Sequence, residues 1–181
     1  EQILELHVLS ALLQRETGPL RYTLEQSKLG KRFSSSVGYF YQSLFLNIAM
    51  SEVQEENAEA VKKIIYEQLE RIVQNPLQQK DLDAIFLGID FELREVKREH
   101  GNPWALTLAE RVLDTWNYGI EPAETLCYRD TFERVKAHIL KDPRSIQDLL
   151  KKYTLENKQC VFSVISPDER FLSERNKAEE A

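Results

Sequence analysis

Residues 44–50 read Leu-Phe-Leu-Asn-Ile-Ala-Met, and a large aliphatic side chain occupies every second position. One side of this pattern carries Leu44, Leu46, Ile48 and Met50. A period of two is typical of a strand with one buried face. Residues 37–41 are a candidate hairpin partner for this strand. The stretch therefore places a β-sheet inside a chain whose other patterns are helical, and this combination decides the fold class.

Two helices are expected before the strand. Apolar residues with helical spacing begin at Ile3, and this helix should end near Arg15. Residues 17–19 read Thr-Gly-Pro, which breaks a helix because proline lacks a backbone donor. A second, short helix is predicted over residues 20–28, ahead of Gly30, a residue type that often stops helices.

Three long helices are expected after the strand, because the apolar residues there recur with helical spacing. The first begins after Asn57, a good N-cap residue, and stops at the Asn-Pro pair of residues 75–76. The apolar spacing of the second helix is lost over residues 97–101, where the helix is expected to end. The third helix runs from the Asn-Pro pair of residues 102–103 to Gly119. The three apolar stripes are, in chain order, Val61, Ile64, Ile65, Leu69, Ile72 and Val73; Leu82, Ile85, Phe86, Ile89, Leu93 and Val96; and Ala105, Leu108, Ala109, Val112, Leu113 and Trp116.

The last part of the chain predicts two shorter helices and another strand. Asp130 heads a variant capping box at the start of the first helix, and residues 145–155 form the second. Residues 160–165 read Cys-Val-Phe-Ser-Val-Ile, a β-rich run that Pro167 cuts off. We expect these strands, although distant in sequence, to pair in one mostly antiparallel sheet covered by helices, which is an α+β fold.

Length and composition indicate one globular domain. The chain has 181 residues, of which 42% are hydrophobic and 30% charged, and its formal net charge is −6. We expect the domain to cover residues 1–167, with a charged tail or the start of an interdomain linker over residues 168–181. Basic and acidic residues are interspersed, which argues against a nucleic-acid partner. No run approaches the roughly 20 apolar residues that span a bilayer, so no membrane partner is expected.

The cysteines and the first residue bear on the chain's origin. Cys127 and Cys160 are expected to be reduced, partly buried thiols in a reducing compartment, such as the bacterial cytoplasm or the mitochondrial matrix. The first residue is Glu1 rather than Met, and helical spacing starts at once. Because native chains rarely begin inside a helix, we expect a fragment of a longer protein, with the first strand of the domain upstream of Glu1.

The histidines do not form a metal-binding pattern. Hydrolytic zinc sites use three protein ligands and a base, and His7, His100 and His138 stand in neither H-E-x-x-H nor H-x-x-E-H spacing. Val96 occupies the position at which Glu99 and His100 would need a second histidine, so we interpret this near match as coincidence. We expect His7 to be a packed or surface residue and His138 to favour the end of its helix through the helix dipole.

The remaining candidates have simple structural interpretations. They are Cys127, Asp81, Asp83, Glu55, Glu56, Trp104 and Trp116. The cysteine has no histidine near it in sequence, the two aspartates favour a helix start through the helix dipole, and the two glutamates suit a solvated turn. The two tryptophans are expected to anchor the core rather than to bind a ligand. We therefore predict no catalytic, cofactor-binding or metal-binding residue in this chain.

Four stretches carry a family resemblance over nearly the whole chain. Residues 17–30 open with Thr-Gly-Pro-Leu and close with Lys-Leu-Gly, similar to a Ser-Pro-Leu helix that ends in Gly-Leu-Gly. Residues 44–53 are similar to the strand that precedes the long helices. Residues 84–95, which end in Phe-Glu-Leu-Arg-Glu, are similar to a Glu-Phe-Ser-Leu-Arg-Glu segment, and residues 116–122 to a Trp-Leu-Tyr-Gly-Gly-Asp-Pro turn. In this order they resemble the second, inactive homologous domain of presequence-protease-like zinc metallopeptidases of the pitrilysin/insulinase (inverzincin) family.

The resemblance implies a two-layer α+β domain of the LuxS/metallohydrolase-like type, paired with homologous domains in two halves that close around a chamber. Zinc would be held by H-x-x-E-H in another domain of the parent protein, and this segment would supply no ligand. Its partners would be the other domains of the same polypeptide and the unfolded peptides that the parent cleaves. The segment itself would be inactive, forming part of the chamber wall and supporting the catalytic domain.

In the family, a far C-terminal domain supplies an Arg and a Tyr to the active site, near an R-x-x-E-Q-L-G-Y pattern. This chain matches that pattern only weakly. Residues 24–26 read Leu-Glu-Gln, but Lys31 follows Gly30 where the pattern has Tyr, and the spacing differs. No catalytic role therefore carries over to any position of this chain.

Two other functions remain open from the sequence. The chain could be a free-standing α+β scaffold that binds a partner through an apolar groove. It could also be an autonomous hydrolase that uses Cys127 or the pair of Glu99 and His100. An H-x-x-E-H motif upstream in the full gene favours the peptidase domain, whereas a reading frame that starts near Glu1 favours the scaffold.

Overall fold

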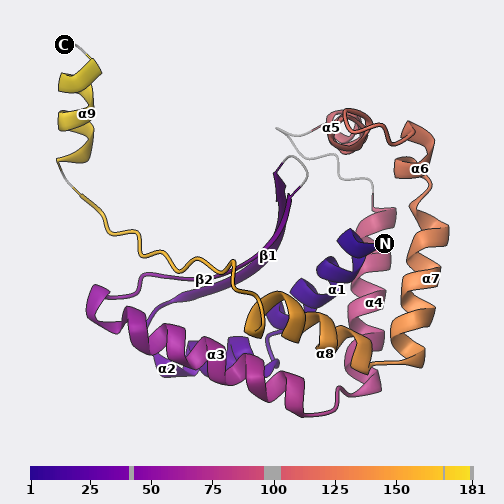
Figure 1. The fold of residues 1–181 in the computed structure, drawn as a ribbon, viewed down its shortest axis with the longest axis horizontal. Helices are drawn as coiled ribbons and strands as arrows, with labels where there is room; N and C mark the ends of the chain where they lie inside the picture. Colours follow the sequence, from indigo (N-terminus) through magenta and orange to yellow (C-terminus); the bar gives the residue numbers. More distant parts are fainter. Residues whose placement is uncertain (41–42, 96–102, 169, 180–181) are drawn as a thin grey trace.

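The computed structural model describes residues 1–40, 43–95, 103–168 and 170–179. In these ranges, the structure combines helices with one antiparallel hairpin, so the expected α+β fold is confirmed. Figure 1 shows the hairpin beside α1, with α4 and α7 side by side beyond α1, and α9 away from the main body. The elements are α1 Gln2–Gln14, α2 Pro19–Ser27, β1 Arg32–Phe40, β2 Ser43–Ser51, η1 Glu55–Asn57, α3 Ala58–Gln74, α4 Gln79–Arg94, α5 Trp104–Trp116, α6 Pro122–Leu126, α7 Tyr128–Lys141, α8 Arg144–Leu150, η2 Lys151–Leu155 and α9 Phe171–Glu179.

The hairpin is longer than the sequence pattern indicates, because pairing between β1 and β2 covers all nine positions of each strand. Its inner side packs on α1, where the buried Ser10 and Ser35 hydroxyl oxygens lie 3.2 Å apart. Gly38 lies opposite Phe45, and a Cβ at position 38 would collide with the Phe45 ring. The ring therefore covers the glycine, which explains a glycine in the interior of a strand.

Helix α1 lies at the centre of the hydrophobic core. It contacts the hairpin as well as α2, α4, α7 and α8. A helix surrounded in this way must be apolar on more than one face, as its sequence is. Its buried apolar residues are Leu6, Val8, Leu9, Leu12 and Leu13.

Helices α4 and α7 close the core on the side away from the hairpin. The fully buried rings of Phe86 and Phe132 meet edge to face, with centroids 6.1 Å apart and planes at 75°. At the surface, Asp90 accepts a hydrogen bond of 2.8 Å from Arg94 Nε and lies 3.6 Å from Arg129 of α7. The Arg94 hydrogen bond holds the pKa of Asp90 below its ordinary value. The two helices are thus joined by a buried ring pair and a surface ion cluster.

Helix α8 is attached to the C-terminal end of α3 by one buried side chain. Gln147 Nε2 lies 2.7 Å from the carbonyl oxygen of Ile72, 3.2 Å from that of Val73 and 2.6 Å from that of Asn75. The last carbonyls of a helix have no partner within the helix itself. Gln147 supplies the donor from another element, and so connects α3 to α8.

Two expected strand and helix features are wrong. Residues 159–168 run as extended chain beyond α8 and η2, and within the described residues they join no sheet, since pairing there is confined to β1 and β2. Helix α7 begins at Tyr128, so Asp130 lies inside its first turn rather than at the cap. Asn57 precedes α3 as expected but makes no side-chain cap hydrogen bond. Val96, predicted to continue the apolar stripe of α4, lies outside the described residues.

The expected burial of the tryptophans and cysteines is also wrong. Trp116 is 57% exposed and Trp104 is only half-buried, because α5 packs mainly on α6 and stays outside the core. Cys127 and Cys160 are both exposed free thiols. None of these four residues is therefore buried in the core of the described part of the chain.

Candidate functional site

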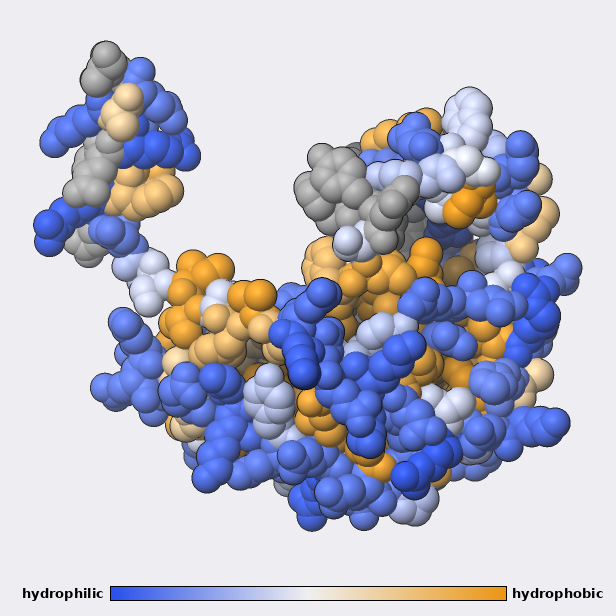
Figure 2. Space-filling view, in the orientation of Figure 1, coloured by the Kyte–Doolittle hydropathy of each residue, from blue (hydrophilic) through white to orange (hydrophobic). Residues whose placement is uncertain are grey.

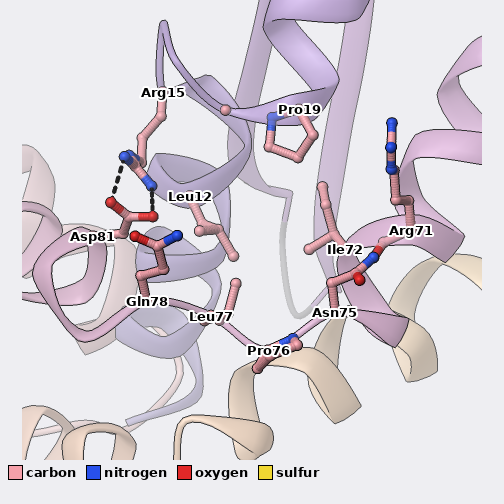
Figure 3. A pocket seen from close by; sticks show the side chains of 11 residues that line it. Leu12, Arg15, Pro19, Arg71, Ile72, Asn75, Pro76, Leu77, Gln78 and Asp81 are labelled. Atoms are coloured by element: carbon pink, nitrogen blue, oxygen red, sulfur yellow. Dashed lines mark hydrogen bonds and ion pairs between the residues drawn. The ribbon is translucent and has the colours of Figure 1, made fainter.

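One hollow of about 360 Å³ lies where the turn between α1 and α2 meets the link between α3 and α4. Figure 3 shows its lining, with Leu12, Ile72 and Leu77 forming an apolar interior. Local sequence explains its shape. Residues 17–19 turn the chain sharply between α1 and α2, and residues 75–78 carry it from α3 into α4 without a helix.

The polar side of the hollow is an ion pair between α1 and α4. Arg15 Nη1 lies 2.7 Å from Asp81 Oδ2, and Arg15 Nη2 donates a 2.8 Å hydrogen bond to Asp81 Oδ1. The side chains are about one quarter and one fifth exposed, respectively, so the pair is largely shielded from solvent. Figure 3 shows Arg71, the other cation of the lining, directed away from this pair. A two-point guanidinium–carboxylate contact fixes the orientation of both groups.

This arrangement is suited to holding two helices rather than to chemistry. The carboxylate of Asp81 is already engaged by Arg15, and the lining contains no histidine, cysteine, serine or lysine. A nucleophile with a general base therefore has no basis among the lining residues. The hollow is therefore a structural junction between α1 and α4, and the prediction that the chain has no catalytic residue stays a prediction.

We expect Asp81→Asn to lower the free energy of unfolding by about 1–2 kcal/mol, because Arg15 then keeps a partly buried charge without its counter-ion. Urea denaturation of the wild type, Asp81→Asn, Arg15→Met and the double variant gives the coupling energy between the two groups. The matched control is Asp83→Asn, since Asp83 is exposed and accepts a 3.0 Å hydrogen bond from Gln79 of its own helix. Equal losses for the two aspartate variants would contradict the assigned role.

The structure does not bring the other candidate residues together. His7 lies on the exposed side of α1, and His138 lies exposed in the last turn of α7, as expected. Desolvation lowers the pKa of His7, against the opposing effect of Glu92, while Arg111 lowers it further. Glu99 and His100 lie outside the described residues. Among the residues that are described, no three His, Cys, Asp or Glu side chains gather as a metal site would require.

The acidic pairs occupy the places that their sequence context predicted. Glu55 and Glu56 form the exposed start of η1, and Asp81 lies in the first turn of α4. Sequence reasoning missed the ion pair with Arg15, because the two residues are 66 positions apart. No local pattern marks such a pair, and only the packing of α4 against α1 creates it.

Comparison with known proteins gives matches over the whole length of the chain. Residues 1–86 match the family described as "Peptidase M16 inactive domain". The chain is 26% identical over 182 residues to "Presequence protease, mitochondrial" of Danio rerio, covering 99% of this chain and 17% of that protein. It is 26% identical over 181 residues to "Protein HypA" of Clostridium perfringens, covering 99% of this chain and 18% of that protein.

A plant relative gives a similar picture. The chain is 27% identical over 161 residues to "Presequence protease 1, chloroplastic/mitochondrial" of Arabidopsis thaliana, covering 87% of this chain and 15% of that protein. The chain thus spans less than a fifth of the length of these relatives. Among its described residues, no helix is both long enough and apolar enough to cross a bilayer.

Proposed function

Residues 1–86 belong to the peptidase M16 inactive-domain family, and from this membership we propose that the chain is a non-catalytic domain of a longer zinc metalloendopeptidase. The resemblance found in the four sequence stretches is confirmed, and similarity to presequence proteases over 99% of the chain supports the same role for the remainder. In this role the domain forms part of the wall of a closed chamber and supports the catalytic domain through its sheet and helices.

The structural observation that supports the proposal is the exposure of residues 159–168. This segment has the composition of a strand, yet Val161 is 88% exposed and Ile165 is 93% exposed. Figure 2 shows the apolar side chains gathered on the surface where this segment leaves the main body for α9. Strand-forming apolar side chains of this size are rarely left bare in a complete domain, so a neighbouring part of a longer protein is the expected cover.

The opposite side of the segment is already held by α3. Lys62 Nζ lies 4.9 Å above the Phe162 ring, and the Tyr66 hydroxyl lies 3.5 Å from Cys160 Sγ. This contact with the thiol raises the pKa of Tyr66. The segment is thus anchored by α3 on one side and exposed on the other, as expected of a surface that another part of a longer protein covers.

The remaining features of the proposal concern the longer protein. Its substrates would be unfolded peptides, because a closed chamber admits chains that can thread into it and excludes folded proteins. A mitochondrial matrix or another reducing compartment suits the two free thiols, and four of the relatives with mitochondrial names support this location. The other domains of the same polypeptide would be its constant partners.

Zinc would be bound elsewhere in the longer protein. A zinc site needs at least three nitrogen, sulfur or carboxylate ligands close together, and the described residues of this chain do not provide such a set. The described residues therefore do not fit the metal, and we propose that the domain acts through support and enclosure.

The proposal is tested with Val161→Lys and Ile165→Lys, each made in this chain and in the longer protein. In the 181-residue chain both positions are exposed, so we expect an unchanged melting temperature. In the longer protein the lysines would be buried without a partner, so we expect the melting temperature to fall by several degrees and peptidase activity to fall with it. Gln159→Lys, at an exposed polar position of the same segment, is the control. Wild-type behaviour of both lysine variants in the longer protein would contradict the proposed role.

A further inference from the structure

The outer side of α4 carries large apolar side chains that the described chain leaves bare. The other side of this helix packs on α1 and α7, and Leu82, Phe86 and Ile89 are buried there. On the outer side, Leu87 is 72% exposed and Phe91 is 65% exposed. These two residues are four positions apart, so they form a ridge along one face of the helix.

A small residue lies next to each member of this ridge. Ala84 and Gly88 are also exposed, and the set of Ala84, Leu87, Gly88 and Phe91 recurs at intervals of three, one and three residues, which places it on one face. We call these four residues the α4 outer face.

Gly88 has no structural explanation within the described chain. Glycine is unfavourable inside a helix, and only proline is worse. No neighbour in the described chain requires it at this position, since nothing lies within 4 Å of the place where its Cβ would stand. Glycine is the usual residue where another group must approach the backbone closely. The open space beside Gly88 therefore indicates that a partner packs against α4.

The α4 outer face is complementary to itself when two copies of the helix meet in antiparallel orientation. A two-fold axis between positions 87 and 88 brings Leu87 of each copy level with Gly88 of the other. The same axis brings Phe91 of each copy level with Ala84 of the other. Every large side chain then has a small residue at its own level in the opposite helix, as close packing of ridges into grooves requires.

The charges at the two ends of α4 favour the same orientation. Lys80 lies exposed in the first turn of the helix, and Glu95 lies exposed at its C-terminal end. The two-fold axis brings Lys80 of each copy level with Glu95 of the other, so opposite charges meet at both ends of the contact. Asp83 and Glu92 lie on the two flanks of the outer face rather than at its centre.

We propose that the α4 outer face binds the same face of a second copy of this chain, as an antiparallel helix pair. Each copy contributes one helix, so the contact lies at the small end of protein interfaces, and we expect a Kd of about 10–100 µM. In dilute solution the chain would be a monomer. In the longer protein the same pairing would join two molecules through this domain.

An unrelated helix is a poorer occupant of this face. A helix of different sequence does not require the large residues, the small residues and the end charges of α4 to be related by one two-fold axis. An isologous contact requires this relation, because each residue pair in it occurs twice.

The test is sedimentation equilibrium of the 181-residue chain at about 5–500 µM, which gives the Kd. We expect a single monomer–dimer equilibrium. The control is Leu106→Ser combined with Leu113→Ser on α5, where the two leucines are 48% and 47% exposed. This double variant removes another exposed apolar surface and should leave the Kd unchanged.

Gly88→Gln separates the proposed contact from a role in the fold. The glutamine side chain has open space in a single copy and is a better helix former, so the melting temperature in dilute solution should rise by about 2–4 °C. In the dimer the same side chain would stand between the two helices, so dimerisation should weaken at least about tenfold.

A charge exchange tests the orientation of the pair. Lys80→Glu places like charges at both ends of the contact and should weaken dimerisation about fivefold. Adding Glu95→Lys to this variant reverses both charges and should restore the wild-type Kd. Failure of the double variant to recover would overturn the antiparallel pairing.

A monomer at every concentration, a Kd that Gly88→Gln leaves unchanged, or loss of the dimer in the double serine variant would overturn the inference. Zinc and cleavage play no part in these measurements, so the inference does not rest on the proposed function. The lysine variants at Val161 and Ile165 test that function on another surface, and the two proposals can fail separately.

Discussion

Phe132→Ala is expected to lower the free energy of unfolding by about 3–5 kcal/mol. Phe132 is 1% exposed, and its ring meets Phe86 edge to face at 6.1 Å, so truncation removes buried area and leaves a cavity between α4 and α7. Single domains have a total stability of about 5–15 kcal/mol, and the variant should lose a large part of it. Urea denaturation followed by far-ultraviolet circular dichroism measures the loss.

The matched control is Phe91→Ala on α4, the helix that also carries Phe86. Phe91 is 65% exposed, so its removal should change the free energy of unfolding by no more than about 0.5 kcal/mol. Equal losses for Phe91→Ala and Phe132→Ala would show that α4 and α7 do not pack as described, with one aromatic ring inside and the other outside.

Gln147→Met is expected to cost about 2–3 kcal/mol of stability although methionine has a similar size and shape. Gln147 is 3% exposed, and its amide is the side-chain donor next to the carbonyl oxygens of Ile72, Val73 and Asn75. Without it, buried carbonyls at the end of α3 lose their partner, and an unsatisfied buried acceptor carries its full desolvation cost.

Gln74→Met provides the comparison, because Gln74 is exposed in the last turn of α3 and its loss uncovers no buried carbonyl. Thermal unfolding of both variants should therefore separate them by several degrees. If Gln147→Met melts with the wild type, the connection between α3 and α8 does not depend on this amide.

The sequence predicted the elements that local patterns encode. The period-two stretch at residues 44–50 became the centre of β2, and the helical stripes became α1, α3 and α4 within a few residues. The turn at residues 17–19 and the stop at Asn75 also lie where expected. These features depend on hydrophobic spacing, proline and glycine, which act over a few positions and can be read from the chain alone.

The errors arose where burial depends on what surrounds an element. An apolar stripe on α5 predicted a core helix, but Trp116 is exposed because the described chain has nothing to cover that face. The β-rich run at residues 160–165 predicted a strand, but a strand forms only beside a partner, and β1 and β2 pair with each other. Both patterns are typical of a buried environment, and the described part of the chain leaves both of them exposed.

Interactions between distant residues were also out of reach. The pair of Arg15 and Asp81 and the capping of α3 by Gln147 join positions separated by 66 residues and by about 75. The local sequence around Asp81, in the first turn of a helix, and around Gln147, in a short helix, does not indicate such a distant partner. The absence of a catalytic site is a prediction from motif spacing, and it stays a prediction for the whole chain, Glu99 and His100 included.

The central claim is that this chain is the inactive part of a longer zinc peptidase. It is tested most directly by measuring zinc content and cleavage of a quenched, unstructured peptide, for this chain and for the longer protein side by side. We predict that the longer protein binds one zinc ion and cleaves the peptide, while the 181-residue chain does neither. Stoichiometric zinc or peptide cleavage by this chain alone would contradict the account, and it would mean that the fold assembles a site from residues such as His100 and its neighbours.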